Sequence, residues 1–64
     1  MQPHQQRVVD EASELRTKVE ALTTFINTNK IFLDLEMTEQ MLLEEQLGYM
    51  KGYLDVLNER IARF

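Results

Sequence analysis

Arginine and histidine side chains near the two ends of the chain are its first candidates for binding a ligand. His4 and Arg7 lie near the start of the sequence, and Arg60 and Arg63 lie near its end. If the ends meet, these side chains form a cationic pole, and the N–H groups of a helix start there would add donors for a small phosphate-bearing ligand. The other interpretation is that arginines in a last helical turn complement the helix dipole.

Two glycines and two tyrosines alternate in the second half of the chain, as Gly48, Tyr49, Gly52 and Tyr53. Each glycine costs a helix about 1 kcal/mol relative to alanine, so the pair needs a compensating contact. Close approach of another helix in an oligomer is one such contact. The alternative is a flat ligand that lies against the bare backbone, flanked by the tyrosine rings.

Residue sets that carry out catalysis are missing from the sequence. There is no cysteine nucleophile, no glycine-rich phosphate loop, and only one histidine, so no metal site of several soft ligands is expected. The acidic pairs Asp10 with Glu14 and Glu44 with Glu45 are expected to be solvated helix faces, because paired carboxylates need a sheltered cleft before they work as acid and base. We therefore expect a binding protein without a cofactor, not an enzyme.

The elements that position these residues follow from apolar spacing. In the first half, apolar residues recur every four and three positions, at Val8, Ala12, Leu15, Val19, Leu22 and Ile26. The second half repeats the pattern at Leu43, Leu47, Met50, Leu54, Leu57, Ile61 and Phe64. Each set forms one stripe, or seam, along a helix. The sequence predicts an all-α fold, with one domain over 1–64 and an antiparallel hairpin of helices over about 4–28 and 37–64.

The ends of these helices carry their own signals. Pro3 suits the start of the first helix, and Asn27, Asn29 and Lys30 interrupt it. The second helix is expected to begin between Glu36 and Thr38. The connection between them is apolar and is expected to cover the end of the hairpin, with an interface role as the alternative; its apolar residues are Ile31, Phe32, Leu33, Leu35 and Met37.

A hairpin of this size leaves a thin core. A domain of 64 residues buries only about 60% of the surface that its unfolded chain exposes, and no disulfide is available to stabilise it. The second helix carries apolar residues off its seam, namely Met41, Leu42, Tyr49, Tyr53 and Val56. We expect these residues to form a contact between protomers, which predicts a homo-oligomer. The regular seams do not determine how many chains the oligomer contains.

Charge and hydropathy exclude some partners. Eleven acidic residues against seven basic ones give a formal net charge of −4, which disfavours nonspecific binding to DNA or RNA polymers and to anionic membranes. No apolar run approaches the ~20 residues that span a bilayer, and the N-terminus MQPHQQRVV lacks the apolar stretch of a signal peptide. We expect a soluble protein.

The segments PHQQRVVDEASEL and EQMLLEEQLGYMKGYLDVLNERIARF resemble a family of small phage-encoded helical proteins related to crAss-phage. The resemblance covers nearly the whole chain. Its most specific part is the order and spacing of Gln40, Leu42, Leu43, Gln46, Met50, Tyr53, Leu57, Arg60 and Ile61. That family is similar to the phage anti-CBASS sponges, helical proteins that assemble as hexamers and sequester the cyclic oligonucleotides with which bacteria signal infection.

The resemblance implies that this chain binds cyclic di- or trinucleotides in the host cytoplasm without cleaving them. Arg60 matches the family's position in the NERI segment and is the first candidate for a phosphate contact. Arg7 is the second candidate, and Arg63 is the third.

The bases of such a ligand need aromatic side chains on which to stack. Ala12 stands where these sponges commonly carry an aromatic residue, so stacking falls to Tyr53 or Tyr49. The family also has a basic residue near the end of the first helix. Lys30 lies close to that position.

A second interpretation belongs to another class of protein. The apolar connection, or the face of Met41, Leu42 and Tyr49, would bind a host or phage protein as a helical interaction module. An apolar patch that stays exposed on the intact oligomer favours this interpretation. An oligomer that buries every such face counts against it.

Overall fold

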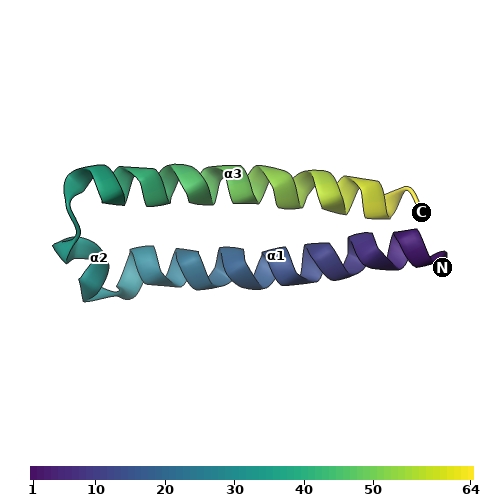
Figure 1. Ribbon diagram of the computed structural model, residues 1–64, viewed down its shortest axis with the longest axis horizontal. Coiled ribbons are helices and arrows are strands. Elements are labelled where there is room, and N and C mark those ends of the chain that lie inside the picture. The colour runs from purple at the N-terminus through teal and green to yellow at the C-terminus, as the bar shows by residue number, and fades with distance from the viewer.

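The computed structural model describes all 64 residues, and its regular structure consists of three helices. The long helices α1 (Pro3–Thr28) and α3 (Met37–Ala62) lie side by side in opposite directions, and the short helix α2 (Lys30–Asp34) joins them (Figure 1). Both termini lie at one end of the molecule and α2 lies at the other. The predicted all-α class and the antiparallel pairing of two long helices are confirmed, whereas the prediction lacked α2.

The short helix α2 exists because of Asn29. The backbone at Asn29 is extended, which ends α1, and its N–H donates to the carbonyl oxygen of Phe25 at 3.1 Å. The Asn29 side chain then accepts a hydrogen bond from the N–H of Ile31 at 2.8 Å and so caps α2. One asparagine thus closes one helix and opens the next, as short polar side chains do at helix starts.

The core lies along the predicted seam. Val8, Ala12, Leu15 and Val19 of α1 are buried against Leu57 of α3, which is only 1% exposed. Half-buried side chains of α3 complete the cluster, namely Leu47, Met50, Leu54 and Ile61. The prediction was wrong for Phe64, which is exposed because α3 ends at Ala62 and no longer holds that residue on the seam.

Phe32 is the buried residue of the hairpin's closed end. Its ring meets the ring of Phe25 edge to face, with the centroids 6.1 Å apart, a favourable arrangement for aromatic pairs. The expectation that the apolar connection covers this end is correct for Phe32 and for half-buried Leu35. It is wrong for Ile31 and Leu33, because the single turn of α2 directs only one face inward. It is also wrong for Met37, which is exposed in the first turn of α3.

The start of α3 is fixed by a side chain from inside the helix. Glu36 is the residue before α3, as predicted, but no side chain caps the helix start there, so neither Glu36 nor Thr38 acts as expected. Instead, the Gln40 amide donates to the carbonyl oxygens of Leu35 at 3.0 Å and of Leu33 at 3.3 Å. Gln40 thereby ties the end of α2 to the first turn of α3.

Candidate functional site

A second line of side chains runs along α3 beside the seam, and we call it the outer stripe. Its members recur every three or four residues, so they share one face of the helix, and Arg63 follows directly after the helix end. They are Glu39, Leu42, Gln46, Tyr49, Tyr53, Val56, Arg60 and Arg63. The apolar members remain open to solvent, from 47% exposed for Tyr53 to 72% for Tyr49. The predicted apolar surplus of this helix is therefore a real surface.

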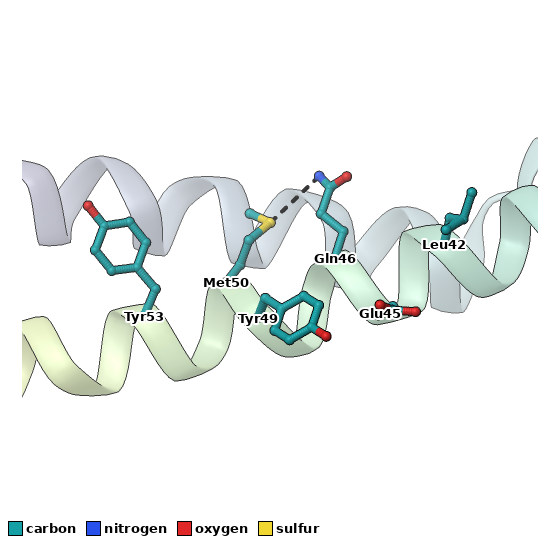
Figure 2. A pocket seen from close by; sticks show the side chains of 6 residues that line it. All are labelled: Leu42, Glu45, Gln46, Tyr49, Met50 and Tyr53. Carbon is teal, nitrogen blue, oxygen red and sulfur yellow. Dashed lines mark hydrogen bonds between the residues drawn. The ribbon is translucent and has the colours of Figure 1, made fainter.

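An open groove with a volume of about 460 Å³ lies on the middle of the outer stripe. All of its lining comes from α3, as Figure 2 shows: Leu42, Glu45, Gln46, Tyr49, Met50 and Tyr53. In Figure 2 the side chains of Tyr53, Met50 and Gln46 rise from α3 on the side where α1 is drawn, whereas the Tyr49 ring lies across α3 itself. Mostly apolar walls with a few polar groups are typical of small-molecule sites.

One contact links the groove to the core. The Gln46 amide nitrogen lies 3.8 Å from the sulfur of Met50, and Met50 packs on the seam. The wall formed by Gln46 and Met50 is therefore anchored to the hairpin. The tyrosine rings make no such contact and are free to meet a ligand or another chain.

Of the six predicted ligand-binding residues, only the two tyrosines line this groove. Arg60 lies on the same stripe, seven residues beyond Tyr53, which is about 10 Å along the helix axis. Arg63 follows one turn later. All four side chains are exposed, so a single face of α3 carries two aromatic rings and then Arg60, and Arg63 follows at the end of the helix.

The remaining predicted cations lie at opposite ends of the hairpin. Arg7 and His4 are exposed in the first turns of α1, at the end of the hairpin where α3 also ends and Arg60 and Arg63 lie (Figure 1). Lys30 begins α2 at the far end of a molecule 46 Å long. Within one chain, Lys30 therefore does not join the arginines.

Gly48 and Gly52 make no contact that requires a glycine. A Cβ atom added at either position would meet nothing within 4 Å. The close approach that the sequence predicted is therefore not made by any other part of this chain. Nothing within the hairpin offsets the helix-weakening effect of the pair.

The acidic pairs lie on open helix faces, as expected. Asp10 accepts a hydrogen bond from the exposed Gln6 amide at 2.9 Å, and Glu14, Glu44 and Glu45 are exposed. No three histidine or acidic side chains are grouped to hold a metal ion. None of the helices has the length and apolarity to cross a membrane. The exposed tyrosines, apolar side chains and arginines of the outer stripe are suited to stacking, apolar contact and phosphate binding, respectively.

Sequence reasoning found the tyrosines and missed the rest of the groove. Leu42 was assigned to an apolar face, and Met50 to the seam, without a shared cavity between them. The spacing of the outer stripe, which runs from Glu39 to Arg63 without a break, would have joined Leu42 and Gln46 to the tyrosines. Met50 lies beside the stripe, so no spacing signal places it in the groove. Gln46 and Arg60 interrupt the apolar character of the stripe, and for that reason an apolar pattern alone does not reveal it.

Comparison with known proteins identifies relatives. Residues 2–63 match the model of the family named Sequestin. This chain belongs to the Sequestin family. An uncharacterized 7.5 kDa protein in the denB-rIIB intergenic region of Enterobacteria phage T4 is 41% identical to this chain over 64 residues, which cover 100% of the chain and 98% of the relative. No solved structure matches. The predicted resemblance to small phage proteins is confirmed.

Proposed function

We propose that this member of the Sequestin family is a non-enzymatic phage anti-defence protein that binds cyclic di- or trinucleotide immune signals in the host cytoplasm and sequesters them intact, as an anti-CBASS sponge. The observation that carries the proposal is the outer stripe, where two exposed tyrosines and two exposed arginines follow one another on one helix face. The family name agrees with sequestration. A homo-oligomer is part of this proposal.

The groove supplies the contacts that nucleobases need. Stacking of a base on an aromatic side chain contributes about 1–3 kcal/mol in other proteins, and both tyrosine rings are accessible. Leu42 and Met50 offer apolar surface beside the rings. The Gln46 amide and the Glu45 carboxylate are positioned to hydrogen-bond with base edges, since an amide both donates and accepts and a carboxylate accepts.

The arginine end supplies the contacts for phosphates. Guanidinium groups bind phosphate oxygens through two parallel hydrogen bonds, which a lysine ammonium does not reproduce. Arg60 is the first candidate, with Arg7 and Arg63 at the same end of the hairpin. None of the side-chain hydrogen bonds within the chain comes from an arginine, so these groups are available to a ligand.

The proposal is tested by titrating the protein with cyclic di-AMP, cyclic di-GMP, cyclic GMP–AMP and cyclic tri-AMP in a calorimeter. We expect one or more of them to bind, and Tyr53→Ala to weaken binding by about 5–150-fold, the equivalent of one lost stacking contact. Arg60→Gln should weaken binding too. Arg16→Gln is the matched control, because it removes the same charge from an exposed site in the middle of α1.

Sequestration is distinguished from cleavage by recovering the ligand. After denaturation of the complex, a sponge releases the nucleotide unchanged, as chromatography against the starting material will show. A panel in which no nucleotide binds, or a linear product after incubation, would contradict the proposal.

A second candidate function is supported by the closed end of the hairpin. Ile31, Leu33 and Met37 are 61%, 72% and 75% exposed, and this patch is separate from the groove. Exposed apolar patches mark protein-binding surfaces, so the alternative is a helical module that binds a host or phage protein here. Hydroxyl-radical labelling of the intact assembly decides whether the patch stays open. Strong labelling of these residues favours the module, and protection of them counts against it.

A further inference from the structure

We propose that a third line of side chains on α3, which we call the acidic stripe, binds a cationic amphipathic helix of another protein. Its members recur every three or four residues, so they share one face of α3, and all of them are exposed. They are Met37, Met41, Glu44, Gly48, Gly52, Asp55 and Glu59. The inference rests on the second candidate function for its apolar end, names the partner that binds there, and is independent of nucleotide binding.

The acidic stripe begins with apolar side chains at the closed end of the hairpin. Met37 and Met41 lie one turn apart and are 75% and 62% exposed. The Gln40 amide donates to the carbonyl oxygen of Leu33 at 3.3 Å, which places exposed Leu33 beside the same turn of α3. Methionine side chains are flexible and adapt to the shape of an apolar partner. This end therefore offers an anchor for the apolar face of another helix.

The backbone beneath this anchor is fixed by contacts of the closed end. Phe32 is buried and its ring meets the ring of Phe25 edge to face. The Asn29 side chain caps α2, and the Gln40 amide joins the end of α2 to α3. A helix that binds here meets a surface that is already ordered, so binding does not have to pay the entropy of ordering a loop.

Charge along the acidic stripe identifies the partner as cationic. Glu44, Asp55 and Glu59 are exposed, and the stripe contains no basic residue. Over residues 37–59 the only basic residue is Lys51. None of the side-chain hydrogen bonds within the chain is donated to these three carboxylates, so they are available to a partner. Opposite charges on two surfaces steer their encounter and fix their relative orientation.

The middle of the acidic stripe is open to close approach of a helix backbone. Gly48 and Gly52 lie one turn apart there, and a Cβ atom added at either would meet nothing within 4 Å. Small residues at a helix contact let two backbones come together. The matching partner therefore has apolar side chains at one end, small residues at its centre, and lysines or arginines at the other end.

A second copy of this chain does not offer such a helix. On α1 the neighbouring cations Arg16 and Lys18 are flanked by Glu14 and Glu20, so no run of basic residues forms. The arginines outside this stretch lie near the start of α1 or the end of α3. Charge complementarity thus assigns the acidic stripe to a different protein.

Binding of a designed peptide to the full chain tests the proposal. The probe is a fluorescein-labelled helical peptide as long as the stripe, with leucines at one end of one face, alanines at its centre and lysines at the other end, made in both sequence directions. We expect one direction to bind at least about tenfold more tightly than a scrambled peptide of the same composition, as measured by fluorescence anisotropy at low salt. If both directions bind no more tightly than the scrambled peptide, the proposal is wrong.

Variants of the chain locate the bound peptide. Met37→Gln with Met41→Gln should weaken binding at least about tenfold, because the leucines of the peptide lose their apolar contact. Asp55→Asn with Glu59→Gln should weaken binding about 2–30-fold at low salt, the equivalent of two exposed ion pairs, and less at high salt.

Matched controls change the same chemistry on α1. Glu14→Gln with Glu20→Gln removes two exposed charges and should leave peptide binding unchanged. Gly48→Leu should block close approach and weaken binding several-fold while the circular dichroism stays helical, whereas Ala21→Leu at an exposed site of α1 should not. Equal losses in a stripe variant and its control overturn the assignment of the peptide to this stripe.

The remaining outcomes separate this inference from the functions proposed above. Binding that depends on Met37 and Met41 but not on Asp55 and Glu59 overturns the cationic partner and keeps the second candidate function. Sedimentation of the same variants without peptide tests for a second copy as the occupant, and loss of the wild-type oligomer in them overturns the proposal. If no peptide binds, the inference fails, and the labelling experiment still decides the second candidate function.

Discussion

The outward faces of α1 and α3 differ, although both helices have 26 residues and share one seam. On α1 no large apolar side chain is exposed, and Thr17 and Thr28 there donate to carbonyl oxygens of their own helix. On α3 six large apolar side chains are exposed: Met37, Met41, Leu42, Tyr49, Tyr53 and Val56. The comparison shows that α1 buries its large apolar side chains within the hairpin, whereas α3 keeps a set of them exposed beside its seam.

The largest expected effect separates the seam from the outer stripe. Leu57 is buried and its neighbour Val56 is half exposed, so the two residues report on different faces of the same turn. We expect Leu57→Ala to lower the free energy of unfolding by about 2–5 kcal/mol, because it leaves a cavity in a thin core. Val56→Ala should cost well under half of that in dilute protein. Urea denaturation measures both, and equal losses would contradict this division of α3.

A double substitution on the outer stripe tests the contact between copies. Leu42→Gln with Val56→Gln should leave the helices formed but weaken association by roughly 2–3 kcal/mol. That is the free energy gained when two apolar side chains are buried in a contact, and the variant loses it. The wild-type melting temperature should rise with protein concentration, and that rise should disappear in the variant. Ala21→Gln on the exposed face of α1 is the control. If the melting temperature of the double variant still rises with protein concentration, the outer stripe is not the contact between copies.

The two glycines give a smaller effect with opposite signs. Gly48→Ala should stabilise the chain by about 1 kcal/mol, since alanine favours helix and the added Cβ meets nothing. Gly52→Ala should stabilise the isolated chain equally but weaken self-association, because Gly52 lies between Tyr49 and Val56 on the edge of the outer stripe. Sedimentation and thermal melts of both variants separate the two effects. Identical melting and sedimentation of the two variants would contradict the placement of Gly52 at the interface.

Much of the fold was predictable because periodicity determines it. The seam spacing predicted the two long helices, since every third or fourth residue must face the other helix, and the signals at their ends placed the bounds of α1 and α3 to within two residues. The helix α2 was not predictable in this way. It depends on which backbone group the Asn29 side chain contacts and on the reach of Gln40 to two carbonyl oxygens, and neither is visible in an apolar pattern.

The site was predictable only in part. The tyrosines and arginines stand out by residue type, and antiparallel pairing places Arg7, Arg60 and Arg63 at one end. The groove depends on how the Gln46 side chain lies beside Met50, and Met50 packs on the core; only three-dimensional packing decides these positions. The position of Lys30 relative to the arginines likewise followed from the length of the hairpin and not from its charge pattern.

The most direct test of the account is native mass spectrometry of this chain, alone and with a mixture of cyclic di- and trinucleotides. The account predicts an oligomer that gains the mass of one or more intact cyclic nucleotides. A chain that remains monomeric and gains no nucleotide would contradict both the proposed homo-oligomer and the proposed sequestration.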